Sequence, residues 1–112
     1  MVSDDRDAAL LLDMLRYAEE ASLIVKGLTY ERYYKDRLRM LALERVLEVV
    51  GEAARHISQS RKDAIADIPW KQLNGQRNAL AHMYGEIDHF QLFRTASEDV
   101  PGLIAMLRKV SR

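Results

Sequence analysis

Four side chains able to bind a phosphate or move a proton lie within eight residues of this chain. Arg77 offers a guanidinium, Asn78 a carboxamide, His82 an imidazole and Tyr84 a phenol, and the residues between them are small or apolar. A guanidinium is permanently charged and can bind two phosphate oxygens as negative charge builds in a transition state. An imidazole titrates near neutrality, so it can take or return a proton. Arg77 and His82 together suit cleavage of a phosphodiester without a metal.

The same residues also fit a purely structural interpretation, because an arginine and a histidine near a helix end commonly cap it and form a surface salt bridge. A metal site is a weaker alternative. His56, His82 and His89 lack the spacing of a ligand pair, and the chain has no cysteine. We therefore predict neither a metal nor a cofactor.

Helical geometry limits how these groups can meet. Asn78 and His82 are four residues apart and lie over one another on a helix, so Asn78 could orient His82 or bind phosphate. Arg77 and His82 are five apart and diverge by roughly 140°. Either the helix ends near His82, with Gly85 releasing the chain, or two copies of the stretch face each other across a dimer.

Apolar residues recur at three- and four-residue spacing, and no alternating pattern predicts a strand. The sequence therefore predicts one all-α domain, residues 1–112, built as a bundle of four main helices with a short extra helix or turn over 59–67. We expect a first helix to about Lys26 ended by Gly27, a second over Tyr30 to Ser58 capped by Thr29, a third over Trp70 to Met83, and a fourth capped by Asp88 and kinked near Pro101.

The second helix carries two rows of different character. The first row is apolar and should be core: Leu43, Val46, Leu47, Val50, Ala54 and Ile57. The next row mixes apolar with ionisable groups: Leu38, Leu41, Arg45, Val49, Glu52 and His56. A mixed row often meets a core and then a partner or a cleft, although Arg45 and Glu52 could simply form surface pairs. Gly51, inside this helix, favours a close helix–helix crossing over direct ligand contact.

Charge and hydropathy limit the class of protein. Seventeen basic residues balance seventeen acidic ones, so whole-chain charge gives no footprint for stable nucleic-acid binding. An enzyme that meets RNA transiently could still use a local basic cluster. No stretch approaches 18 continuous apolar residues, and the acidic N-terminus lacks the apolar segment of a signal peptide. We expect no membrane span and a cytoplasmic location.

The order of several motifs resembles the HepT-like toxin family of HEPN domains. Arg77, His82 and Tyr84 match its Arg-x4-His-x-Tyr motif, and Asn78 matches the common Arg-Asn form. Further segments look like the same family along nearly the whole chain: Val49-Val50-Gly51-Glu52-Ala53, Ile68-Pro69-Trp70, Asp88 and Asp99-Val100-Pro101.

The resemblance implies a four-helix up-and-down bundle that forms a homodimer, with both motifs lining a cleft at the interface and cleaving RNA without a metal. It implies Arg77 and His82 as catalytic residues, with Asn78, Tyr84 and Glu52 in support. It further implies the toxin of a type VII-like bacterial or archaeal toxin–antitoxin pair. The partner would be an MntA-like minimal nucleotidyltransferase that silences the nuclease by attaching AMP to Tyr84.

Two other functions remain open at this point. The chain could be a non-catalytic subunit that presents a nucleotide or substrate to a nucleotidyltransferase, so that the same polar cleft binds phosphate but cuts nothing. It could also be a helical dimerisation module whose motif only stabilises the interface. Cleavage of RNA in the presence of EDTA separates the first of these from the nuclease.

Overall fold

The computed structural model describes residues 2–83 and 85–110, except for the side chains of 2–4. Within these residues the fold is all-helical, as predicted, and contains no strand. The elements are α1 (Val2–Val25), α2 (Tyr30–Tyr34), α3 (Arg37–Arg55), α4 (Gln59–Ala64), α5 (Trp70–His82), α6 (His89–Arg94), the π-helical segment η1 (Thr95–Asp99) and α7 (Val100–Val110). The radius of gyration is 14.0 Å, close to the roughly 13 Å of a compact chain of this length.

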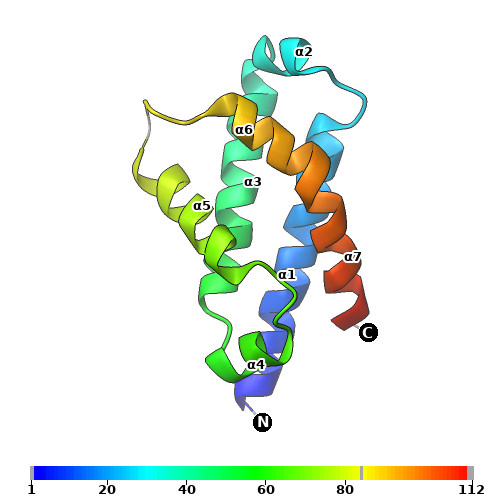
Figure 1. The fold of residues 1–112 in the computed structure, drawn as a ribbon, viewed down its shortest axis with the longest axis vertical. Helices are drawn as coiled ribbons and strands as arrows, with labels where there is room; N and C mark the ends of the chain where they lie inside the picture. Colours follow the sequence, from blue (N-terminus) through cyan, green and yellow to red (C-terminus); the bar gives the residue numbers. More distant parts are fainter. Residues whose placement is uncertain (1, 84, 111–112) are drawn as a thin grey trace.

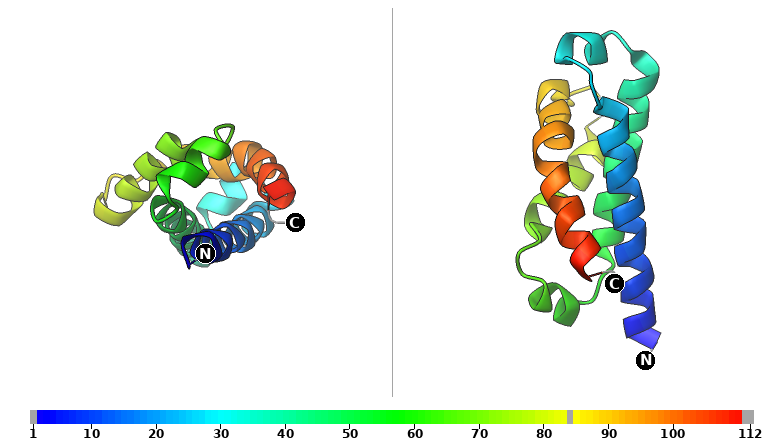
Figure 2. Two further views of the ribbon diagram at one scale, coloured as in Figure 1. Left: turned by 90° about the horizontal axis from the view of Figure 1, so that it is seen from below. Right: turned by 90° about the vertical axis from the view of Figure 1, so that its right-hand side faces the viewer.

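The long helices α1 and α3 run antiparallel, side by side, and form the centre of the fold (Figure 1). The segments η1 and α7 pack against α1 and α6 contacts α2, whereas α5 packs chiefly against α3. Seen from below, α5 and α7 lie over the same face of the α1–α3 pair, with α5 on the α3 side and α7 on the α1 side (Figure 2). The motif helix is therefore held mainly by one neighbour, α3.

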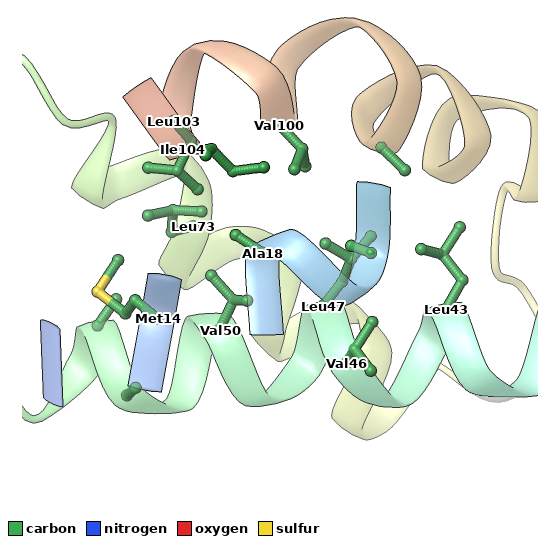
Figure 3. Close-up of a cluster of buried hydrophobic side chains, with 14 of the residues drawn as sticks. Met14, Ala18, Leu43, Val46, Leu47, Val50, Leu73, Val100, Leu103 and Ile104 are labelled. Atoms are coloured by element: carbon green, nitrogen blue, oxygen red, sulfur yellow. The ribbon is translucent and has the colours of Figure 1, made fainter. Parts of the chain in front are cut away.

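The core fills the space between α1, α3 and α7 (Figure 3). Met14 and Ala18 of α1 are fully buried, and Leu47 and Val50 of α3 face them together with Leu103 of α7. Removal of this apolar surface from water drives the packing of the three helices. The predicted core row of the second helix is confirmed, because all six of its members are buried.

The prediction of one unbroken helix from Tyr30 to Ser58 is right about its start but wrong about its continuity and its end. Thr29 does cap α2, but the chain leaves helical geometry at Asp36, whose carboxylate accepts the N–H of Arg39 at 3.1 Å and starts α3. An aspartate in this position offers the backbone an alternative to the helical hydrogen bond. At the other end α3 stops at Arg55, and Ser58 caps α4 instead.

The kink predicted near Pro101 takes the form of a π-helical turn. Asp88 caps α6 as expected, and the helix then widens over η1, where the N–H of Val100 bonds the carbonyl of Thr95, five residues back. Pro101 has no N–H, and its ring would press on the carbonyl of Ser97 in a regular helix. The wider turn accommodates both effects.

Two smaller features agree with the sequence patterns. Gly27 has a φ of 73°, the left-handed conformation that favours glycine just after a helix end. None of the described helices is long and apolar enough to span a lipid bilayer.

Candidate active site

The position of α5 is set by its crossing of α3 at Gly51. A Cβ atom on Gly51 would overlap the Cβ of Arg77 and lie 2.8 Å from the backbone oxygen of Leu73. Any other residue at position 51 would therefore hold the two helices apart. The close crossing predicted from this glycine is confirmed, and its partner is the arginine of the motif.

This crossing places Arg77 beside Glu52, the residue that follows Gly51. The Nε atom of Arg77 lies 2.6 Å from Oε2 of Glu52, and the arginine side chain is only 19% exposed. The Nε atom is buried, and its N–H bond is poorly aligned for a hydrogen bond, so the contact is best described as an ion pair. A half-buried pair of this kind is screened less by salt than a fully exposed one.

Glu52 is the centre of a small charged cluster on α3. Its Oε1 atom lies 3.0 Å from Nε2 of His56 and 3.9 Å from Nη1 of Arg55. The hydrogen bond from His56 and the charges of Arg77 and Arg55 together hold the pKa of Glu52 below its ordinary value. The carboxylate is therefore ionised at neutral pH and available to orient Arg77.

Asn78 provides a second contact for the guanidinium. Nη1 of Arg77 donates a hydrogen bond to Oδ1 of Asn78 at 3.1 Å. Asn78 was expected either to orient His82 or to bind phosphate. In the described part of the chain its carboxamide is hydrogen-bonded to Arg77, and no bond joins it to His82.

His82 is the last residue of α5, so the helix ends where one of the two geometric alternatives places its end. Its imidazole is exposed, and within residues 2–83 and 85–110 no hydrogen bond or ion pair joins it to another side chain. Arg77 turns toward α3 instead. One copy of the chain thus brings together Arg77, Asn78, Glu52 and His56 but leaves His82 unattached to them.

The other residues considered for the site differ in their relation to the cluster around Glu52. Arg45 is 71% exposed and lies 3.7 Å from Glu48, so the structure does not bring it to the cluster. The predicted role of Tyr84 lies outside the described residues. Arg55 was not singled out from the sequence, although its three-residue spacing from Glu52 on one helix could have indicated the pair. No group of three or more potential ligands in the described chain could hold a metal ion.

The arrangement supplies two chemical functions on the same helix. A guanidinium fixed by a carboxylate and a carboxamide keeps further N–H donors for a phosphate, because arginine carries five. An exposed imidazole lies five residues later at the helix end, where a substrate can reach it. Phosphodiester cleavage needs both groups, provided that the guanidinium of Arg77 and the imidazole of His82 can reach the same phosphate.

Known proteins with similar sequences agree with this chemistry. The model of a family described as ribonuclease HepT-like matches residues 14–110. "Putative RNase MJ1380" of Methanocaldococcus jannaschii is 34% identical over 93 residues, which make up 83% of this chain and 85% of that protein. "Putative RNase MJ1216" of the same organism is 30% identical over 102 residues, 91% of this chain and 84% of that protein.

A third relative, "Probable ribonuclease HepT" of Thermococcus cleftensis, is 28% identical over 102 residues, or 91% of this chain and 93% of that protein. No solved structure gives a significant match. The family model spans most of the chain, including Gly51, Glu52 and the whole motif from Arg77 to Tyr84. The chain therefore belongs to the HepT-like family of ribonucleases.

Proposed function

We propose that this chain is a metal-independent RNA endonuclease and the toxin of a type VII-like toxin–antitoxin pair in the bacterial or archaeal cytoplasm. The observation that carries the proposal is the fixation of Arg77 between Glu52 and Asn78 on the helix that ends at His82. Membership of a ribonuclease family supplies the substrate class. Residues 1–112 would act as one domain.

In this mechanism Arg77 holds the scissile phosphate and His82 moves the protons. The 2′-oxygen of the ribose attacks phosphorus while an imidazole accepts its proton, and the bond to the 5′-oxygen breaks as that oxygen receives a proton. The products are a 2′,3′-cyclic phosphate and a free 5′-hydroxyl. Arg77 stabilises the negative charge that builds on the phosphate oxygens.

A second copy of the chain would complete the site. The mixed row of α3 carries two large apolar residues on the surface, with Leu38 80% exposed and Leu41 45% exposed. The same row continues along the helix to Glu52. An exposed apolar strip of this kind is typical of an interface. A two-fold axis beside it would bring two copies of Arg77 and His82 into one cleft, in a dimer of four-helix up-and-down bundles.

An MntA-like nucleotidyltransferase would be the antitoxin. Transfer of AMP to the Tyr84 hydroxyl would add negative charge and a bulky base near the place where RNA phosphates bind, opposing the substrate by repulsion and by blockage. With ATP, Mg²⁺ and the cognate transferase, the wild-type chain should gain the mass of AMP. The same gain in Tyr84→Phe would show that another residue is modified.

The central test is cleavage of RNA in EDTA by His82→Ala, with His89→Ala as the matched histidine control. His82→Ala should abolish cleavage and growth arrest while leaving the dimer intact by light scattering, and His89→Ala should keep both. Undiminished cleavage by His82→Ala would remove the proposal.

The separation of His82 from Arg77 within one copy favours one alternative, a non-catalytic subunit that binds a nucleotide or substrate for the transferase. Purified wild-type protein that binds nucleotide in EDTA but cuts no RNA would establish that alternative. Cutting that disappears in Arg77→Ala supports the nuclease. If Arg77→Ala lowers the melting temperature but leaves RNA cleavage unchanged, the motif is only structural.

A further inference from the structure

A groove of about 530 Å³ lies between α5 and the helical run of α6, η1 and α7. Figure 1 shows α5 diverging from this run toward its own C-terminal end. The floor of the groove consists of core residues, among them Leu47 and Val50 of α3 and Leu103 of α7. Arg77, Asn78 and His82 do not line it. The groove is therefore a concave surface separate from the candidate active site.

The groove cannot close by a simple shift of α5. At the Gly51 crossing, α5 is in close contact with α3, and the ion pair of Arg77 with Glu52 holds it there. A movement of α5 toward α7 would break both contacts. The opening is thus a consequence of the same packing that positions the arginine.

The chemistry of the groove excludes RNA and selects a cationic, apolar occupant. Glu86, Asp88 and Asp99 are charged residues on its lining, and no lysine, arginine or histidine of the described chain lines it. Phosphates would be repelled by this edge, whereas lysine or arginine would be attracted. The apolar floor favours aliphatic side chains, and the carboxamides of Gln72 and Gln76 on α5 can hydrogen-bond a polar edge.

We propose that this groove seats an amphipathic helix of the partner protein, apolar on the face that enters and bearing lysine or arginine along its edges. The 13 residues of α5 give the groove a wall of roughly 20 Å, enough for three turns of a bound helix. Helix-in-groove binding uses apolar anchors at three- and four-residue spacing.

The location of the groove gives the docked helix a role. Met83, Glu86, Ile87 and Asp88 line the groove, and all four belong to the segment between α5 and α6. Tyr84 follows Met83 directly in the sequence. A transferase held in the groove would therefore have its target tyrosine in the same connecting segment of the sequence. In this respect the inference rests on the proposed function, because the partner is the enzyme that modifies Tyr84.

Two synthetic helical peptides of about 15 residues, identical in their leucine face, test the groove directly. One carries lysine along its edges and the other glutamate. Calorimetry on the full chain should show binding of the lysine peptide, with a negative heat-capacity change from apolar burial. The affinity should weaken as salt rises. The glutamate peptide should bind at least about tenfold more weakly, and equal affinity for the two peptides would overturn the proposal.

Variants on α5 locate the binding. Ala79→Phe fills the groove and should weaken the lysine peptide at least about tenfold, whereas Asn74→Phe, an exposed α5 position outside the groove, should leave its affinity unchanged. Asp99→Lys should weaken the lysine peptide and strengthen the glutamate peptide. Equal peptide binding by Ala79→Phe and Asn74→Phe would overturn the proposal. If light scattering shows a dimer for wild type and Asn74→Phe but a monomer for Ala79→Phe, the groove binds a second copy of this chain. That result would also overturn the proposal.

The outcome is independent of the nuclease. RNA cleavage by Ala79→Phe should equal that of wild type, because Ala79 lies outside the candidate active site. Wild type that binds the lysine peptide but cuts no RNA would defeat the proposed function and leave the groove assignment standing. With the cognate transferase, AMP transfer should become slower in Ala79→Phe through a higher KM for the chain. An unchanged KM would overturn the assignment to this partner.

Discussion

Replacement of Gly51 by alanine should separate the two helices that hold the candidate site. In an ordinary helix interior, Gly→Ala stabilises by about 1 kcal/mol because alanine loses less backbone freedom. At position 51 the added Cβ would overlap the Cβ of Arg77 and lie 2.8 Å from the oxygen of Leu73, about 0.6 Å short of ordinary van der Waals contact. The obstacles are a backbone atom and the base of a side chain, so a rotamer change cannot relieve them.

Helices α3 and α5 must therefore move apart, and this movement sets the expected change in the free energy of unfolding. Overpacking of this kind costs typically 1–3 kcal/mol, against a gain of about 1 kcal/mol in helix propensity. We therefore expect Gly51→Ala to lower the free energy of unfolding by about 1 kcal/mol. Activity should fall further, because a displacement approaching 1 Å moves Arg77 relative to Glu52 and can cost about 10²-fold in rate.

Gly75 provides the matched control within α5, because a Cβ there would meet nothing within 4 Å. Gly75→Ala should raise the free energy of unfolding by about 1 kcal/mol and leave cleavage unchanged. Urea denaturation gives both free energies, and single-turnover cleavage of RNA gives the rates. If both alanine variants stabilise the chain equally, the close crossing at Gly51 is refuted.

Three further predictions concern other parts of the molecule. Glu52→Gln should lower kcat for RNA cleavage about tenfold while lowering KM, because Arg77 loses its orienting carboxylate and the site gains net positive charge; steady-state kinetics would show the split. Hydrogen bonds from the Ser58 hydroxyl and N–H hold the pKa of buried Asp7 below its ordinary 3.8. The ionised Asp7 carboxylate therefore stabilises the fold above pH 3.8, and this stabilisation is lost as the pH falls below 3.8 and the carboxylate is protonated. Asp7→Asn should therefore cost about 2 kcal/mol at pH 7 and show a smaller further loss below pH 4 in acid denaturation. Leu41→Arg should convert a dimer to monomers by light scattering with unchanged circular dichroism, and a persistent dimer would move the interface elsewhere.

Much of the fold followed from periodicity, and the errors have local causes. The apolar row from Leu43 to Ile57 identified the buried face of α3, because burial follows the 3.6-residue period directly. The break at Asp36 was missed because an aspartate inside an apparently continuous helical pattern is ambiguous. Its side chain either faces solvent or caps a new helix. Pro101 signalled an irregularity but could not specify a π turn over the residues before it.

The candidate site was predictable in its residue types but not in its contacts. Helical arithmetic already separated Arg77 from His82, and the structure turns Arg77 toward α3. The pairing of Arg77 with Glu52 depends on where along its length α3 is crossed by α5. Two residues 25 positions apart in the sequence give no periodic signal of such a contact. Gly51 was the one clue, since a glycine inside a helix often marks a close approach. The groove beside α5 was not predictable, because it follows from the divergence of two helices whose apolar faces both look like ordinary core.

Glu52 has two opposing effects on the proposed chemistry, and their balance explains its place in the site. Its charge partly neutralises Arg77 and so weakens the pull on RNA before reaction. In return it fixes the guanidinium through Nε, while Asn78 engages Nη1, which leaves the remaining N–H donors available to a phosphate. Fixed donors favour the transition state more than the ground state, because they need no reorganisation when charge develops. His56, Arg77 and Arg55 hold the pKa of Glu52 below its ordinary value, so Glu52 stays charged at neutral pH. Its titration therefore cannot account for any change in cleavage rate near neutrality.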